Sequence, residues 1–115
     1  MRINITSVLV DDQAKALKFY TEALGFQKKM DIPLGEYRWL TVTSPEGAEG
    51  VELVLEPLGY PFARTYQKAL YDAGIPFTVF ATNDIHGEIR RLRERGVVFR
   101  GEPENMGPVI GVMFE

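Results

Sequence analysis

The sequence predicts an α+β fold in which one structural unit occurs twice. Residues 8–26 run from a short apolar segment through acidic residues and an amphipathic helix to a glycine, and residues 79–99 repeat that order. Two copies of one unit within 115 residues favour a paired sheet with a shared cleft, where function is expected. A chain of this length buries roughly 65% of its unfolded surface, which is enough for a hydrophobic core.

Composition excludes several classes of function. Hydrophobic residues make up 45% of the chain and charged residues 25%, as in ordinary globular proteins. The net charge of -3 argues against a nucleic-acid partner, because phosphate binding needs clustered basic side chains. The chain has no cysteine, which rules out disulfides, thiolate metal sites and cysteine nucleophiles. No segment predicts a signal peptide or a membrane span, so we expect a cytoplasmic protein without a membrane partner.

The first half predicts the order β-α-β-β-β. Asp12 is a suitable N-cap for the helix, because its carboxylate can accept the free N–H groups of the first turn. Gly25 is expected just after the helix, where glycine adopts a left-handed conformation at little cost. A turn at Pro33–Gly35 is expected to end the second strand. The strands are predicted at 2–10, 26–32, 37–43 and 51–56, with a further turn at 44–47.

The second half predicts the order β-α-β-β and lacks the final strand of the first. A connecting helix over 62–73 ends at Gly74. A strand at 75–82 follows, then a helix between Asp84 and Gly96, and strands at 97–100 and 109–115. The fourth strand is expected to be lost from the protein, to lie beyond this sequence, or to come from another chain. The single domain thus comprises module one at about 1–57, a linker and helix at 58–74, and module two at 75–115.

Three segments of the chain carry recognisable motifs. The clearest is the pattern formed by Asp12, Ala16, Phe19, Tyr20, Leu24, Gly25 and Phe26. The other two are Gly-Val-Glu-Leu-Val-Leu-Glu-Pro (50–57) and Met-Gly-Pro-Val (106–109). Together they resemble the glyoxalase / bleomycin-resistance / extradiol-dioxygenase superfamily, also called the vicinal oxygen chelate fold. The resemblance covers essentially the whole chain and implies paired βαβββ modules that form a cupped mixed sheet, often in a homodimer.

The resemblance also implies where metal ligands would stand. Many members hold a divalent metal in the cup with His, Glu or Gln side chains. At the family's first ligand position this chain has Ile5, and at the equivalent position of the second module it has Phe77. Neither side chain can bind a metal. A third position carries Glu52, and the last would lie on the absent strand. Because one carboxylate does not hold a transition metal, we expect no cofactor and no metal site.

Strand alternation places Glu52, Val54 and Glu56 on the cup side of the fourth strand. On the neighbouring strand, Trp39 and either Tyr37 or Arg38 are further candidates, and the pattern does not decide which side chains point inward. Glu52 either orients a ligand or acts as a general acid or base, or it lies at an exposed or interface position and pairs with a lysine or arginine. Trp39 either stacks on a ligand or belongs to the core or a dimer interface.

Three functions are compatible with these observations. The first is metal-independent binding of a small apolar or aromatic molecule, with Ile5, Arg38, Trp39, Glu52 and Phe77 as the candidate ligand-binding residues. The second is a metal-dependent lyase, isomerase or dioxygenase with Glu52 as the catalytic residue. The third is a non-catalytic dimerisation or regulatory module. The sequence favours the first, because isoleucine and phenylalanine occupy two positions where a metal would need donors.

Overall fold

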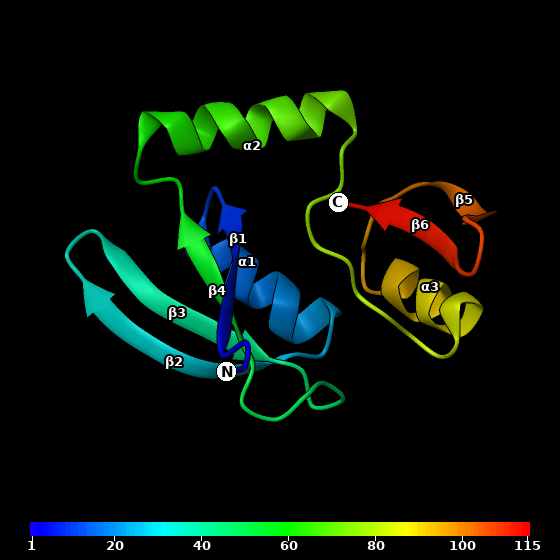
Figure 1. The fold of residues 1–115 in the computed structure, drawn as a ribbon, viewed down its shortest axis with the longest axis horizontal. Coiled ribbons are helices and arrows are strands. Elements are labelled where there is room, and N and C mark those ends of the chain that lie inside the picture. The colour runs from blue at the N-terminus through cyan, green and yellow to red at the C-terminus, as the bar shows by residue number, and fades with distance from the viewer. The chain divides into compact units, whose positions relative to one another are not determined.

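A mixed four-stranded sheet dominates the first of the two units into which the chain divides, residues 1–78 and 79–115. The computed structural model describes all 115 residues. β1 runs parallel to β4, whereas β4–β3 and β3–β2 are antiparallel (Figure 1). The predicted α+β class and the four strands of the first half are confirmed. The spatial order is β1 (Ile5–Val10), β4 (Glu52–Pro57), β3 (Tyr37–Thr43) and β2 (Gln27–Leu34).

The helix between β1 and β2 begins and ends where the sequence predicts. Asp12 caps α1 (Gln13–Lys18), because its carboxylate accepts the N–H of Lys15 at 3.1 Å. α1 continues directly into a turn of π-helix, η1 (Phe19–Ala23). Gly25 then has φ +79°, a conformation that other residues rarely adopt, so the predicted glycine stop is confirmed.

α1 and η1 cover one face of the sheet, which we call the covered face. Leu40, Val42 and Leu55 on this face have no exposed surface at all. Burial also raises the pKa of Tyr20 to about 12, since a charged phenolate is disfavoured in this environment. The hydrophobic core of the unit consists of Val10, Tyr20, Leu40, Val42, Leu53 and Leu55.

Gln13, the first residue of α1, connects that helix to two strands. Its side-chain amide donates to the carbonyl oxygens of Arg38 on β3 and Leu55 on β4, at 2.7 and 2.9 Å. Its amide oxygen accepts the N–H of Arg38 at 3.0 Å. The residue is only 9% exposed, so these main-chain groups have little access to water. Gln13 therefore satisfies three main-chain groups, of which the carbonyl of Leu55 is buried and the two groups of Arg38 are partly buried.

β2 extends two residues into the turn predicted at Pro33–Gly35. It ends at Leu34, and Pro33 is registered opposite Arg38. Proline is tolerated there because β2 is the edge strand of the sheet, where a missing N–H breaks no ladder. Next to this pair, Arg38 forms a bidentate ion pair with Asp31, at 2.9 and 2.7 Å. This hydrogen-bonded pairing lowers the pKa of Asp31 to about 2.

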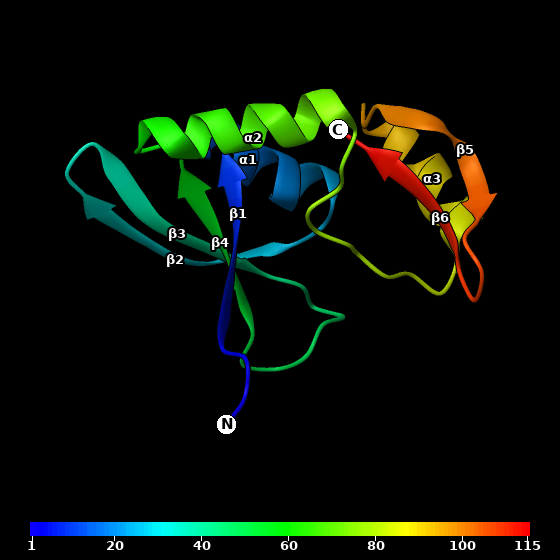
Figure 2. The ribbon, with the colours of Figure 1, turned by 45° about the horizontal axis from the view of Figure 1, so that its top comes forward.

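α2 (Pro61–Ala73) follows β4 and lies beyond the carboxyl ends of β1 and β4 (Figures 1 and 2). Gln67 on this helix donates to the carbonyl of Leu9 at 3.0 Å, and Ala63 is buried. Gly74 ends the helix with φ +67°, as the sequence predicts. No helix of the chain is long and apolar enough to cross a membrane.

The second unit contains α3 (Ile85–Glu94), β5 (Phe99–Asn105) and β6 (Ile110–Phe114). Asp84 caps α3 by accepting the N–H of Gly87 at 3.0 Å, and Gly96 follows the helix with φ +88°. The predicted helix and the two strands after it are confirmed. The module boundaries drawn from the repeat stay a prediction, because the two units reflect spatial contacts rather than repeated sequence.

The strand predicted at 75–82 is wrong, because these residues form neither helix nor strand. In the first unit the corresponding strand, β1, pairs only with β4. Among residues 79–115 no counterpart of β4 exists. A strand without a partner leaves its main-chain N–H and C=O groups unpaired, so the apolar pattern of this segment alone does not produce one.

Replacing Gln13 by alanine should destabilise the first unit by about 2–4 kcal/mol, because three buried or partly buried main-chain groups lose their partner. Urea unfolding followed by the fluorescence of the single tryptophan, Trp39, measures this unit directly. Gln67→Ala is the matched control and removes one bond to Leu9, for which about 1 kcal/mol is expected. Equal losses in the two variants would contradict the role given to Gln13.

The lowered pKa of Asp31 predicts a change of stability with pH. A carboxyl group with a lower pKa in the folded state stabilises the fold above its unfolded value, here 3.8. That contribution is lost as the pH falls toward about 2. Wild type should therefore be more stable than Asp31→Asn at pH 7, and the difference should shrink between pH 4 and pH 2. Asp72→Asn on α2 controls for the loss of one carboxylate. A constant difference for Asp31→Asn would contradict the prediction.

Candidate functional site

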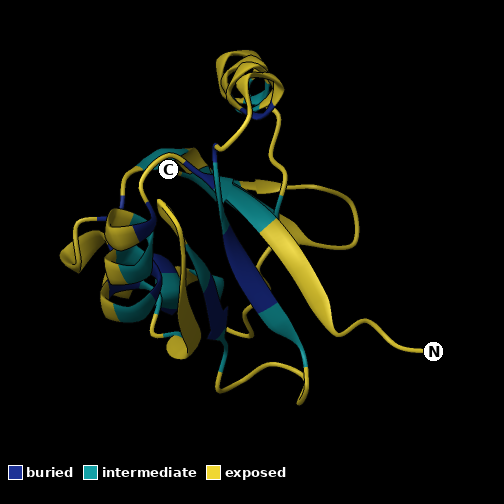
Figure 3. Cartoon of the chain, turned by 90° about the vertical axis from the view of Figure 1, so that its left-hand side faces the viewer, coloured by how far each residue is buried: buried dark blue, intermediate teal, exposed yellow.

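The face of the four-stranded sheet opposite α1 carries apolar and aromatic side chains, and we call it the open face. Its members alternate along each strand with the residues of the covered face. Several of these side chains are exposed to solvent: Ile32 is 44% exposed and Leu34 is 57% exposed. Figure 3 shows the contrast between the exposed first half of β1 and the buried middle of β4. The open face consists of Ile5, Ser7, Leu9, Met30, Ile32, Leu34, Tyr37, Trp39, Thr41, Thr43, Glu52, Val54 and Glu56.

Glu52 stands at the start of β4 on this face, as alternation predicts, and it is half-buried. Its register partner on β1 is Ile5, so a branched apolar side chain lies beside the carboxylate. The hydroxyl of Thr41 donates to Oε1 of Glu52 at 2.7 Å. The main-chain N–H of Met30 donates to the same hydroxyl oxygen at 3.1 Å. Within the chain, Glu52 therefore forms no ion pair with a lysine or arginine.

β3 contributes two aromatic residues to the open face. Trp39 is registered opposite Ile32, and Tyr37 opposite Leu34. Trp39 is half-buried and Tyr37 is 41% exposed, so both rings present surface on this face. The structure thus decides between the candidates that the sequence left open: Tyr37 and Trp39 share the face of Glu52. The role of Trp39 in ligand binding stays a prediction.

Arg38 lies on the other face of the sheet. Its neighbours in the chain, Tyr37 and Trp39, point to the open face, so alternation directs Arg38 away from it. Its guanidinium binds Asp31, and its main-chain N–H binds Gln13. The ion pair raises the pKa of Arg38, which keeps the guanidinium charged. The structure therefore does not bring the Arg38 guanidinium together with Glu52, because it binds Asp31 on the other face.

Phe77 lies on no strand, because the predicted strand at 75–82 does not form. Its ring packs edge-on against Tyr66 of α2, with the ring centroids 6.0 Å apart. The side chain is 59% exposed. The structure therefore does not group Phe77 with Ile5 and Glu52.

Sequence reasoning missed Thr41 as a functional residue. It is completely buried and occupies the middle of β3, where it is registered with both Met30 and Val54. The sequence signal that could have indicated it is a polar residue, Thr41, between the apolar residues Leu40 and Val42. Linking it to Glu52 requires the register of β3 against β4, which no local pattern provides.

The residues at the family's ligand positions do not fit a metal. Ile5 offers no donor atom, and Phe77 is an aromatic side chain away from the sheet. No group of three or more histidine, aspartate or glutamate side chains is close enough to hold a metal ion. Zinc, iron and manganese centres normally take three or four protein donors. Glu52 alone does not supply them.

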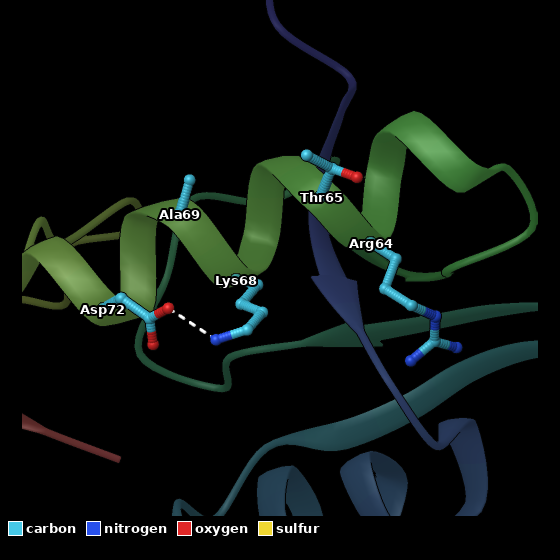
Figure 4. Close-up of a pocket in the computed structure, with 5 residues that line it drawn as sticks. All are labelled: Arg64, Thr65, Lys68, Ala69 and Asp72. Atoms are coloured by element: carbon cyan, nitrogen blue, oxygen red, sulfur yellow. Dashed lines mark hydrogen bonds and ion pairs between the residues drawn. The ribbon is translucent and has the colours of Figure 1, made fainter.

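Two hollows lie elsewhere on the first unit. One, of about 410 Å³, lies along α2 and is lined by that helix alone (Figure 4). Its most prominent feature is an exposed ion pair between Lys68 and Asp72 at 2.6 Å, one turn of helix apart. Such pairs belong to solvated helix surfaces and contribute little. The other, of about 340 Å³, is lined by Asp11, Asp12, Gln13, Ala14, Glu36, Tyr37, Arg38, Pro57, Leu58 and Arg64. Neither contains Glu52 or Trp39, so the open face remains the candidate site.

Comparison with known proteins agrees with this fold. Residues 2–114 match the model of the Glyoxalase/Bleomycin resistance protein/Dioxygenase superfamily. The chain is 49% identical over 115 residues to the uncharacterized protein YurT of Bacillus subtilis (strain 168), covering all of this chain and 91% of YurT. A second protein of that bacterium, YetH, is 40% identical over 106 residues, which cover 91% of this chain and 81% of YetH.

Solved structures show the same architecture. The crystal structure of UcmS2 is similar with a TM-score of 0.83 and 31% identity, covering 99% of this chain and 89% of UcmS2. TnmS3, described as an antibiotic binding protein from Streptomyces sp. CB03234, is similar with a TM-score of 0.74 and 33% identity, over 99% of this chain and 85% of TnmS3. The chain therefore belongs to the Glyoxalase/Bleomycin resistance protein/Dioxygenase superfamily.

Proposed function

We propose that the protein binds a small, flat, largely apolar molecule on the open face and does so without a metal. The observation that carries this proposal is the chemistry of that face. Trp39 and Tyr37 offer aromatic surface, Ile5 and Ile32 offer aliphatic surface, and Glu52 and Glu56 are the two carboxylates of this face. Small-molecule sites have this composition: mostly apolar walls with a few placed polar groups.

The similarity to TnmS3, an antibiotic binding protein, covers 99% of this chain and supports a binding role. The donor set supports metal independence. Ile5 stands opposite Glu52 in the β1–β4 register and has no donor atom for a metal. Because Glu52 belongs to no group of three or more histidine, aspartate or glutamate side chains, the face suits burial of an organic ligand better than coordination of a metal.

A homodimer and a cytoplasmic location are part of this proposal. The open face exposes Ile5, Ile32, Leu34 and Tyr37 in a single chain. Contiguous exposed apolar surface of this kind marks sites of binding or association. A second copy that covers part of the face would enclose a ligand between subunits.

Ligand binding is tested with 1-naphthylmethanol, a flat aromatic probe that carries one hydroxyl. It should raise the melting temperature, because a ligand that binds only the folded state stabilises it. It should also move the single indole N–H resonance of Trp39 in a ¹H–¹⁵N spectrum. Trp39→Leu should weaken binding about tenfold through loss of aromatic contact.

Tyr71→Leu is the matched control, since it removes an exposed aromatic ring from α2. It should leave the affinity for 1-naphthylmethanol unchanged. Equal affinity in wild type and Trp39→Leu, or an unmoved Trp39 resonance at saturation, would place binding elsewhere and overturn the proposal.

Metal independence is tested by elemental analysis of protein purified without a chelating tag. We expect no stoichiometric divalent metal, because Glu52 carries a donor group for a metal whereas Ile5 and Phe77 carry none. Addition of EDTA should leave both the melting temperature and the affinity for 1-naphthylmethanol unchanged. One bound divalent ion per chain, or loss of binding in EDTA, would contradict this part of the proposal.

A further inference from the structure

We propose that Thr41 is a positioning residue that holds Glu52 as a hydrogen-bond acceptor, so that the open face selects flat ligands carrying an ammonium or hydroxyl donor. This inference rests on the proposed function and gives its ligand a chemical class. It is carried by a continuous set of contacts across three strands: Met30 N–H to Thr41 Oγ1 at 3.1 Å, and Thr41 Oγ1 to Glu52 Oε1 at 2.7 Å.

The direction of these two hydrogen bonds follows from the groups involved. A main-chain N–H can only donate, so the Thr41 oxygen is the acceptor toward Met30. The single hydroxyl proton is then committed to Glu52, which accepts it. Because Thr41 has no exposed surface, water does not compete for this proton. Thr41 thus fixes one carboxylate oxygen of Glu52 and supplies it with a donor.

A β-bulge provides the N–H that orients Thr41. Lys28 is registered opposite Val42, and Met30 opposite Thr41, so Lys29 is an extra residue in β2. A bulge disrupts the regular ladder and redirects the groups beside it. Here the N–H of Met30 donates to the side chain of Thr41. The bulge therefore contributes a main-chain donor to the site.

The second oxygen of Glu52 decides which ligands are favoured. The Glu52 carboxylate makes no hydrogen bond or ion pair in the structure other than the one with Thr41. Its free oxygen can accept a bond from a ligand N–H or O–H, and an ionised carboxylate has only acceptors to offer. Apolar surface from Ile5 and Trp39 lies on the same face. A ligand that places an ammonium or hydroxyl beside an aromatic ring matches both features, whereas a ligand carboxylate would be repelled.

Three probes with equal numbers of heavy atoms test this selectivity: 1-naphthylmethylamine, 1-naphthylmethanol and 1-ethylnaphthalene. Wild type should bind the amine and the alcohol at least about tenfold more tightly than the hydrocarbon, since bonds to charged groups are the stronger ones. Comparison of the amine with the alcohol separates the effect of charge from that of a neutral donor. Thr41→Val should reduce the donor preference several-fold, whereas Thr41→Ser, which keeps the hydroxyl, should retain it.

Thr65→Val is the matched control, because Thr65 lies on α2, outside the open face, and its hydroxyl donates to the carbonyl of Pro61 in the same helix. It should leave the donor preference unchanged. A general loss of folding would lower the affinity for all three probes alike and would not change the ratio of their affinities. An unchanged ratio in Thr41→Val, or equal wild-type affinity for all three probes, would overturn the inference while leaving binding at the open face intact.

A measurement without ligand separates the two proposals. In Thr41→Val the amide of Met30 loses its acceptor and should exchange with solvent faster than in wild type, Thr41→Ser or Thr65→Val. If Met30 exchange does not respond, the positioning role is wrong whatever the probes do. If it responds and no probe moves the Trp39 resonance, the proposed function fails, and the ligand selectivity fails with it.

Discussion

The side-chain amide of Gln13 is the interaction on which the rest of the first unit depends. β3 and β4 are registered at only two pairs, Thr41 with Val54 and Val42 with Leu53. Beyond these pairs the amide of Gln13 bonds to main-chain groups of Arg38 and Leu55. The preceding residue, Asp12, caps the same helix. Two consecutive residues therefore fix the start of α1, one by capping the helix and the other by bonding to the sheet. This anchorage places α1 on one face and leaves the other open.

β3 links the two faces that result. Its alternate residues Leu40 and Val42 complete the core under α1, and Tyr37, Trp39 and Thr41 define the open face. Thr41 stands where β3 is registered with both neighbours, so its backbone is restrained from two sides. A hydroxyl on such a restrained strand has a well-defined position, which is what a group that orients a carboxylate requires.

The sequence predicted the local features of the fold well. Asp12 and Asp84 cap their helices, and Gly25, Gly74 and Gly96 end helices with positive φ, because caps and stops depend on residues only a few positions apart. The strand prediction for segment 75–82 was wrong because it depends on contacts that are not local. Its composition favours a strand, but strand formation depends on a partner distant in sequence. The candidate site was predictable only in part for the same physical reason. Alternation placed Glu52 correctly, whereas in β3 both alternating sets contain large apolar residues, so Trp39 could not be oriented from pattern alone.

The hydrogen bonds around Glu52 bear on the chemistry that the open face supports. A metal ion bound by Glu52 would need further oxygen or nitrogen donors at about 2.0–2.6 Å. The Thr41 hydroxyl beside it already accepts from Met30, while its proton is directed to Glu52. Ile5, opposite Glu52 on β1, has no donor atom. The Thr41 hydroxyl therefore stabilises the carboxylate by a hydrogen bond, and in the proposed binding mode its remaining acceptor capacity suits a donor group of an organic ligand.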